Sequence, residues 1–385
     1  MNNLKFLSQV MGVILIIASL TGCNAPGVTP ALLPPPTQAQ PGLGRPSLFK
    51  FIRTVQVTPD DLFLIGGFAR IGYIPATDRF AVVFGTHLAH PSGGCELGAH
   101  AYKEYTADME PTGKSGVLNC GVGDGGGTMV DNVYYDVSMY REGDLVGWRI
   151  IKYDAVTWKS LANIFYTIVP PKEGDGDPLV SYVNGKLDVA SGYTEDAKPP
   201  PQDEGAASHH NFLSPGLVLQ DKKRLSDTPH RSEGSIIYVD GVYSYVTSTS
   251  YTGDLIVMRY DQDWQYLGSK MIRKQAHFPT GVAFDGQRYY LAFLDTTQKN
   301  GARFFPYYPN VHLAAFDRDW NLMDDVAVTN FAPPGYMTGR PWVILHENRL
   351  YVSYDVAPLE AGTGKELLDQ IEAYVGIYEL VQGAP

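Results

Sequence analysis

Alternating apolar and polar residues, rich in Val, Ile, Tyr, Phe and Thr, recur along the chain from residue 48 to its end. Alternation with a period of two predicts β-strands, because successive side chains of a strand point to opposite faces of its sheet. A helical period is nearly absent outside residues 365–374 (KELLDQIEAY). The sequence therefore predicts an all-β domain.

Pairs of short strands joined by a tight turn are predicted at four places. Asn-Gly or Asp-Gly pairs at 184–185, 240–241 and 285–286 favour two-residue hairpin turns, which need a positive φ. The four segments are 179–191 (LVSYVNGKLDVAS), 236–248 (IIYVDGVYSYVTS), 282–293 (VAFDGQRYYLAF) and 343–354 (VILHENRLYVSY).

A second motif repeats between these hairpins. Residues 257–267 (VMRYDQDWQYL) resemble residues 313–323 (LAAFDRDWNLM), and earlier copies are centred on Trp158 and Met109. Residues 216–225 (GLVLQDKKRL) fill the remaining position as a degenerate copy. A unit of about four short strands repeated every 45 to 60 residues is typical of a β-propeller blade.

The repeats predict six blades, and a five-bladed ring with one irregular unit is the alternative. The last unit is one strand short, whereas residues 48–58 (LFKFIRTVQVT) precede any complete unit. We expect this N-terminal strand to complete the last blade, because such closure removes an exposed sheet edge. The expected units are 70–122, 123–172, 173–228, 229–275, 276–332 and 333–381.

The first residues predict export. Lys5 precedes an apolar run at 10–20 that is too short for a mature transmembrane helix. Residues 20–23 (LTGC) resemble a bacterial lipobox, and an ordinary secretory signal is the alternative. The resemblance implies that a signal peptide at 1–22 is removed and that Cys23 carries fatty acids such as palmitate. Asn24, where an Asp would suggest the inner membrane, then favours the outer membrane or the cell surface.

The segment that follows reads as a spacer between membrane and domain. Residues 23–46 contain prolines at 26, 30, 34, 35, 36, 41 and 46 and almost no charge. Such a composition favours extended polyproline II, which reaches about 3 Å per residue. We therefore expect a tether at 23–46 and a propeller domain at 47–385, with the membrane as a partner through the lipid on Cys23.

Composition and charge narrow the classes of function. The chain is 44% apolar and 18% charged, which is enough apolar sequence for a large core, and its formal net charge is −11. That charge repels phosphate backbones, so nucleic acid is not an expected partner. Cys95 and Cys120 are expected to form a disulfide in an exported protein, with two free buried thiols as the alternative.

Three carboxylates are the candidate catalytic groups. The first strands of a propeller surround one channel, so function is expected at its mouth. Asp131 (TMVDNVYYD), Asp177 (GDGDPLVSYVNGK) and Glu233 (RSEGSIIYVDG) fall on three successive units. The alternative role for Asp177 and Glu233 is to cap strand ends by accepting hydrogen bonds from backbone amides.

These segments resemble the arabinanase-like glycoside hydrolases, whose propellers have five blades. The Asp-Pro pair at 177–178 before an Asn-Gly turn, and Glu233 followed by Gly234, Tyr238 and an Asp-Gly turn, carry the resemblance. It implies that Asp131 is the base, that Asp177 tunes the acid and orients the sugar, and that Glu233 protonates the leaving oxygen. Inversion needs two carboxyls about 6.5 to 9.5 Å apart.

Further residues are candidates for binding a ligand. Phe304, Phe305, Tyr307 and Tyr308 (RFFPYYPNVH) would stack on sugars or anchor a partner protein if exposed, or wedge blades together if buried. Positive charge at the funnel would come from Arg231, Arg273 and Arg340, the last of which lies beside Trp342.

Histidines and glycines suggest no cofactor. His209, His210, His230 and His277 lack metal-enzyme spacing, and we expect a role at the surface or funnel rim without a metal. Gly121, Gly123 and Gly126 match G-x-G-x-x-G, but a strand rather than a helix follows them, so no dinucleotide is expected.

The sequence therefore favours a membrane-anchored, extracytoplasmic β-propeller lipoprotein that binds a glycan or a partner protein at its funnel. An inverting glycoside hydrolase of arabinanase-like type and a scaffold subunit of a cell-envelope complex are the alternatives.

Overall fold

The structure is a computed structural model that describes most of the predicted propeller. The described residues are 46–57, 67–86, 99–120, 125–142, 145–167, 178–192, 206–230, 233–249, 253–297, 309–331, 336–359 and 371–381. All of them belong to the compact unit Pro36–Pro385. Cys23, the proposed tether up to residue 45 and Cys95 lie outside the described residues, so the predictions made for them stay predictions.

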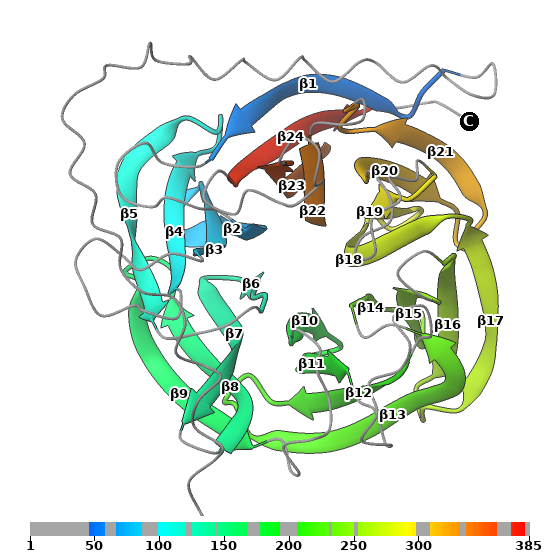
Figure 1. Cartoon of the computed structure of the whole chain (residues 1–385), viewed down its shortest axis with the longest axis horizontal. Coiled ribbons are helices and arrows are strands. Elements are labelled where there is room, and N and C mark those ends of the chain that lie inside the picture. Colours follow the sequence, from blue (N-terminus) through cyan, green and yellow to red (C-terminus); the bar gives the residue numbers. More distant parts are fainter. Residues whose placement is uncertain are drawn as a thin grey trace, which may run out of the picture. The chain divides into compact units, whose positions relative to one another are not determined.

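Every described sheet has four strands, and six such sheets surround one axis (Figure 1). In blades 1 to 5 the strands follow chain order from the axis outward. Blade 1 has β2 (Gly67–Ile74), β3 (Arg79–Thr86), β4 (Ala99–Thr106) and β5 (Pro111–Cys120), and blade 2 has β6 (Thr128–Val130), β7 (Val133–Glu142), β8 (Leu145–Asp154) and β9 (Lys159–Thr167). Blade 3 has β10 (Leu179–Val183), β11 (Lys186–Gly192), β12 (Ala206–Leu213) and β13 (Leu219–His230), and blade 4 has β14 (Ser235–Val239), β15 (Val242–Ser248), β16 (Leu255–Asp261) and β17 (Tyr266–Arg273). Blade 5 has β18 (Ala276–Phe284), β19 (Tyr289–Asp295), β20 (Asn310–Phe316) and β21 (Leu322–Ala327). The six-bladed prediction is confirmed, and the five-bladed alternative is excluded.

The last blade is completed by the other end of the domain. Blade 6 has β22 (Tyr336–His346), β23 (Arg349–Pro358) and β24 (Glu372–Leu380), and β1 (Phe49–Gln56) forms its outermost strand. β1 pairs antiparallel with β24, from Phe49 opposite Leu380 to Gln56 opposite Tyr374 (Figure 1). The predicted closure by the N-terminal strand is confirmed. The last residues of the stretch with a helical period, 372–374, belong to strand β24.

Apart from strands, the described residues contain one 3-10 turn at Pro75–Thr77. No helix in this part of the chain is long and apolar enough to cross a membrane.

One turn conformation repeats between the third and fourth strands of blades 1 to 5. In each turn one residue has a positive φ, between 55° and 64°; these residues are Met109, Trp158, Leu217, Trp264 and Trp320. A side-chain oxygen three or four residues earlier accepts hydrogen bonds from the turn's backbone amides, as Asp317 does from Asp319 and Asn321. The degenerate copies at Met109 and Leu217 therefore keep the geometry of the repeat although they lack its tryptophan.

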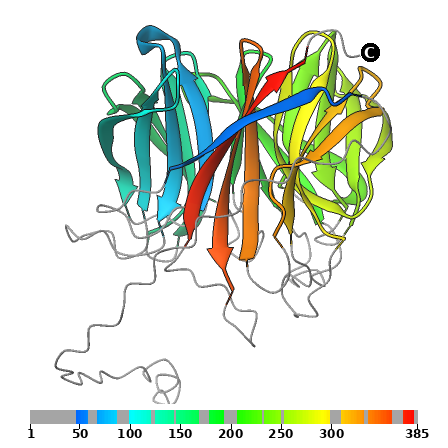
Figure 2. The ribbon, with the colours of Figure 1, turned by 90° about the horizontal axis from the view of Figure 1, so that it is seen from above.

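The two ends of the blades differ. The tight turns between first and second strands and between third and fourth strands lie on one face, which we call the turn face (Figure 2, top). Because neighbouring strands are antiparallel, the connections between second and third strands and between successive blades all leave from the opposite face, which we call the connection face.

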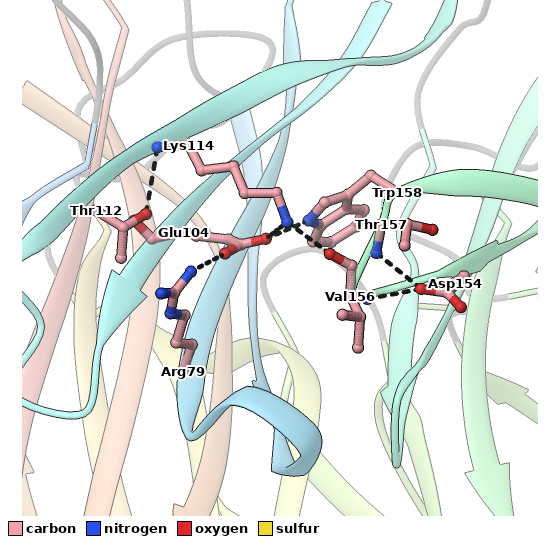
Figure 3. A network of polar contacts seen from close by, with 8 residues as sticks. All are labelled: Arg79, Glu104, Thr112, Lys114, Asp154, Val156, Thr157 and Trp158. Carbon is pink, nitrogen blue, oxygen red and sulfur yellow. Dashed lines mark hydrogen bonds and ion pairs between the residues drawn. The ribbon is translucent and has the colours of Figure 1, made fainter.

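A buried carboxylate near the turn face joins blades 1 and 2. Glu104 on β4 is 2% exposed, and its Oε1 accepts a hydrogen bond from Trp158 Nε1 at 2.7 Å (Figure 3). Lys114 Nζ lies 2.6 Å from the same oxygen, and Arg79 donates to Oε2 at 3.2 Å. The two cations compensate the buried charge, so this network is a structural link between blades.

We expect Glu104→Ala to lower the free energy of unfolding by about 3 kcal/mol, because the Trp158 indole N–H loses its buried acceptor. Urea unfolding would measure the change. Glu110→Ala is the control, since Glu110 is 64% exposed and forms a surface ion pair with Arg53; its cost should be below about 1 kcal/mol. Equal effects of the two variants would contradict a structural role for the network.

Candidate functional site at the connection-face mouth of the channel

Three innermost strands bulge where they approach the connection face. The register of pairing with the second strand of the blade shifts at three places: between Gly67 and Arg70 in β2, between His277 and Gly281 in β18, and between Gly339 and Trp342 in β22. Inside two of these bulges, Phe68 and Phe278 have φ of 54° and 51°. A positive φ is costly for a bulky side chain, and bulges next to functional sites re-aim side chains.

The bulges bring a cation and aromatic rings together. The guanidinium of Arg340 lies 3.9 Å from the ring centroid of Phe68 and 5.1 Å from that of Phe278. These three side chains come from blades 6, 1 and 5. Contacts of this length are favourable cation–π interactions, and they hold the half-buried arginine in place.

A buried histidine adjoins this group. The His277 ring lies 3.7 Å from the Phe278 ring, and its Nδ1 is 2.7 Å from the hydroxyl of Ser248 on β15. Ser235 at the start of β14 donates to the carbonyl of Pro279 at 3.0 Å. Blades 4 and 5 are therefore joined at the same end of the channel.

A second buried polar cluster lies between blades 3 and 4. Asp188 Oδ2 is 2.7 Å from His210 Nδ1, and His210 Nε2 is 3.0 Å from the hydroxyl of Ser208. Tyr245 hydrogen bonds with Ser208 and Thr247. Burial raises the pKa of Tyr245, and the neighbouring carboxylates of Asp188 and Glu233 raise it further.

Glu233 lies at the channel end of this cluster. It is 2% exposed and precedes β14 by two residues. Gly126 precedes β6 by two residues, so it occupies the corresponding place in blade 2. The catalytic role of Glu233 stays a prediction, and Asp177 lies outside the described residues.

Asp131 requires a correction. It follows β6, is exposed, and has a φ of 51° in the turn that leads into β7. It therefore lies on the turn face, whereas Glu233 lies toward the connection face. The physical reason is that β6 is only three residues long, so the residue expected before the hairpin instead forms its turn. The structure does not bring Asp131 and Glu233 together.

The other predicted binding residues divide into three groups. His277 and Arg340 both contact Phe278, and the ring of Trp342 lies 4.5 Å from the guanidinium of Arg70. The ring of Tyr238 packs against the ring of Tyr243, with centroids 4.5 Å apart, near the turn face. Arg273 on β17 of blade 4 forms ion pairs with Asp295 and Asp325 of blade 5. The structure does not describe Arg231, Phe304, Phe305, Tyr307 and Tyr308. For His209, His230 and Cys120 it describes the strand but not the side chain.

Several residues of the site were not predicted from the sequence: Phe68, Arg70, Asp188, Ser208 and Phe278. His210 was expected at the surface or funnel rim, but it is fully buried in β12, where Asp188 pairs with it. Asp188 carried a usable signal, because the second strand of a blade is buried on both faces and a carboxylate there needs a partner. Phe68 and Phe278 carried none, since their aim depends on bulges. The described residues contain no group of three or more His, Cys, Asp or Glu side chains placed to hold a metal ion.

Comparison with known proteins places the chain by fold. No family model and no curated protein matches it. Among solved structures, phage phi92 endosialidase is similar with a TM-score of 0.57 and 9% identity, over 87% of this chain and 70% of that one. The subtype N10 neuraminidase-like protein of A/little yellow-shouldered bat/Guatemala has a TM-score of 0.48 and 9% identity, over 87% of this chain and 100% of that one. The chain is a six-bladed β-propeller, and the likeness to the endosialidase is one of fold.

Proposed function

We propose that this protein is a lipid-anchored, extracytoplasmic propeller that binds a glycan at the connection-face mouth of its channel. The observation that carries the proposal is the position of Arg340 between Phe68 and Phe278, each held in a strained backbone conformation. Strain of this kind persists where the surrounding structure enforces it, and it clusters at ligand sites.

The chemistry of the mouth suits a sugar. Aromatic rings offer faces to the apolar side of a pyranose, while a guanidinium and a carboxylate form strong hydrogen bonds to hydroxyls. The half-buried Phe68 would supply an aromatic ring and Arg340 the cation, whereas Phe278 and Glu233 are 4% and 2% exposed and would support the site from inside the protein. The shared fold with an endosialidase supports a carbohydrate ligand.

The membrane anchor belongs to the same proposal. The lipobox-like residues 20–23 and the proline-rich segment at 23–46 support lipidation of Cys23 and a spacer that lets the domain reach a ligand beyond its membrane. Each buried methylene of an acyl chain contributes about 0.8 kcal/mol to membrane binding.

Replacing the proposed lipidation site tests the anchor. We expect Cys23→Ser to move the protein from the detergent phase to the aqueous phase in Triton X-114 partitioning, and the fatty-acid mass to disappear from its N-terminal peptide. Cys120→Ser is the control and should stay in the detergent phase. Detergent partitioning of Cys23→Ser equal to that of the wild type would contradict the anchor.

The glycan site is tested by a matched pair of arginine variants. Arg340→Ala should raise the Kd for the glycan about tenfold. The loss of one hydrogen bond to a charged group costs about 1.4 kcal/mol, which corresponds to that change in Kd. Arg318→Ala is the control, because Arg318 lies 5.6 Å over Phe284 and pairs with Asp240 at the turn face.

A glycan array would first identify a ligand for the full-length protein, and calorimetry would compare the variants. Equal loss in both variants would argue against the mouth as the site. Recovery of a stoichiometric envelope protein, with no glycan bound, would favour the scaffold role instead.

Hydrolysis is the second candidate, and burial of the Glu233 carboxyl beside Tyr245 and Asp188 favours it. A buried carboxylic acid can be held protonated to serve as a general acid. The arabinanase-like assignment of Asp131 as base does not fit its place on the turn face, so the partner carboxylate would be Asp177 or another group.

If the protein is a hydrolase, Glu233→Gln should abolish release of reducing sugar from the polysaccharide that the wild type cleaves, without changing its thermal unfolding. A folded Glu233→Gln protein of wild-type activity would remove Glu233 from the mechanism. A wild-type protein inert on a broad polysaccharide panel would leave glycan binding without catalysis.

A further inference from the structure

Each of the three bulges at the mouth is supported by a hydroxyl from the preceding blade of the ring. In every case the hydroxyl donates a hydrogen bond to a backbone carbonyl inside the bulge, and the residue that carries it is at most 2% exposed. The pairs are Ser353 with Ala69, Ser235 with Pro279 and Thr280 with Pro341, at 2.7, 3.0 and 2.6 Å. The bulges are therefore tied to their neighbouring blades by side chains.

The bulge in β2 contains the half-buried aromatic ring of the mouth. Strand β3 pairs with Gly67 and with Arg70 but skips Phe68 and Ala69 between them. Bulged residues lose their place in the ladder, and buried backbone groups need other hydrogen-bond partners.

Blade 6 supplies these partners from its second strand, β23. The Ser353 hydroxyl that donates to Ala69 also accepts a hydrogen bond from the backbone N–H of Ile71 at 3.3 Å. Asp355 Oδ2 accepts from the backbone N–H of Phe68 at 3.1 Å. Ser353 and Asp355 are two residues apart on one strand, so their side chains lie on the same face. Two side chains of blade 6 thus replace the missing strand pairing of the bulge.

The position of the Asp355 carboxylate depends on a glycine. Gly339 lies opposite Asp355 in the pairing of β22 with β23. A Cβ at residue 339 would lie 2.7 Å from Asp355 Cγ, which is too close for two carbon atoms. Glycine at 339 therefore leaves the room that the carboxylate occupies.

The same carboxylate acts on the charge beside the bulge. Burial lowers the pKa of Arg70 to about 10, the like charge of Arg340 also lowers it, and Asp355 raises it. Asp355 therefore offsets part of the positive charge of Arg70 while it holds the neighbouring backbone.

We propose that Ser353 and Asp355 are positioning residues of the mouth, which hold Phe68 in the left-handed conformation that stacks its ring on Arg340. A positive φ is costly for a bulky residue and persists only where the surroundings enforce it. The hydrogen bonds from blade 6 to this bulge provide that constraint. The effect on ligand binding rests on the proposed glycan site.

Hydrogen exchange of the full-length protein in detergent, resolved to single amides, tests the positioning role without a ligand. Ser353→Ala should speed exchange at Ile71 and Phe68 about tenfold, because the bulge opens more readily. Ser138→Ala is the matched control. Ser138 is also 0% exposed, but its hydroxyl has no hydrogen-bond partner among the described residues.

Gly339→Ala tests Asp355 without removing its carboxyl group. The added methyl group should displace the carboxylate and speed exchange at Phe68 about tenfold, whereas Ile71 should keep its protection through Ser353. Asp355→Asn retains an oxygen that can accept the same hydrogen bond, so exchange at Phe68 should stay close to that of the wild type.

Calorimetry with a glycan found on the array tests the consequence for binding. Ser353→Ala and Gly339→Ala should each raise the Kd about tenfold, and Ser138→Ala should leave it unchanged. A purely stabilising role would lower the Tm of Ser353→Ala and leave its Kd at the wild-type value.

Unchanged exchange at Phe68 in both Ser353→Ala and Gly339→Ala, or equally faster exchange there in Ser138→Ala, would overturn the proposal. Faster exchange with an unchanged Kd would refute the link to recognition if Arg340→Ala weakens glycan binding. If Arg340→Ala binds as tightly as the wild type, the proposed glycan site fails instead, and exchange alone decides whether Ser353 and Asp355 position Phe68.

Discussion

Pairing of β1 with β24 is the constraint on which the rest of the structure depends. Without β1 the last blade would have only three strands and no pairing would link the two ends of the domain; eight residues from the start of the domain supply the fourth strand. Closure fixes the distance between the innermost strands, so that Arg70 of blade 1 reaches Thr280 of blade 5. The channel and its polar lining exist because the ring is closed.

The two faces of the ring differ in how regular their backbone is. On the turn face, each turn between third and fourth strands in blades 1 to 5 has a side-chain oxygen that accepts backbone hydrogen bonds and one residue with a positive φ, from Met109 in blade 1 to Trp320 in blade 5. On the connection face, strands β2, β18 and β22 depart from regular pairing and place strained aromatic residues at the axis. A repeated turn stabilises each blade in the same way, whereas an irregular bulge serves one position only.

Two buried charges differ in how far protein groups pair with them. Glu104 is surrounded by Arg79, Lys114 and the indole of Trp158, so its hydrogen-bonding capacity is used within the protein. Arg70 uses one of its nitrogens in that way and leaves two buried ones unpartnered. Both buried charges join blades, since Glu104 links blades 1 and 2 and Arg70 links blades 1 and 5.

The sequence by itself determined the all-β class, the six repeats, the hairpin turns and the closing strand, because alternation and turn chemistry are local properties. It also placed Glu233, His277, Arg340 and Trp342 near the channel. Only the tertiary structure decided that Asp131 lies on the turn face and that Phe68, Phe278 and Arg70 join the site. Those positions depend on the length of β6, on bulges, and on contacts across the axis, which arise only when blades distant in sequence are packed into a closed ring.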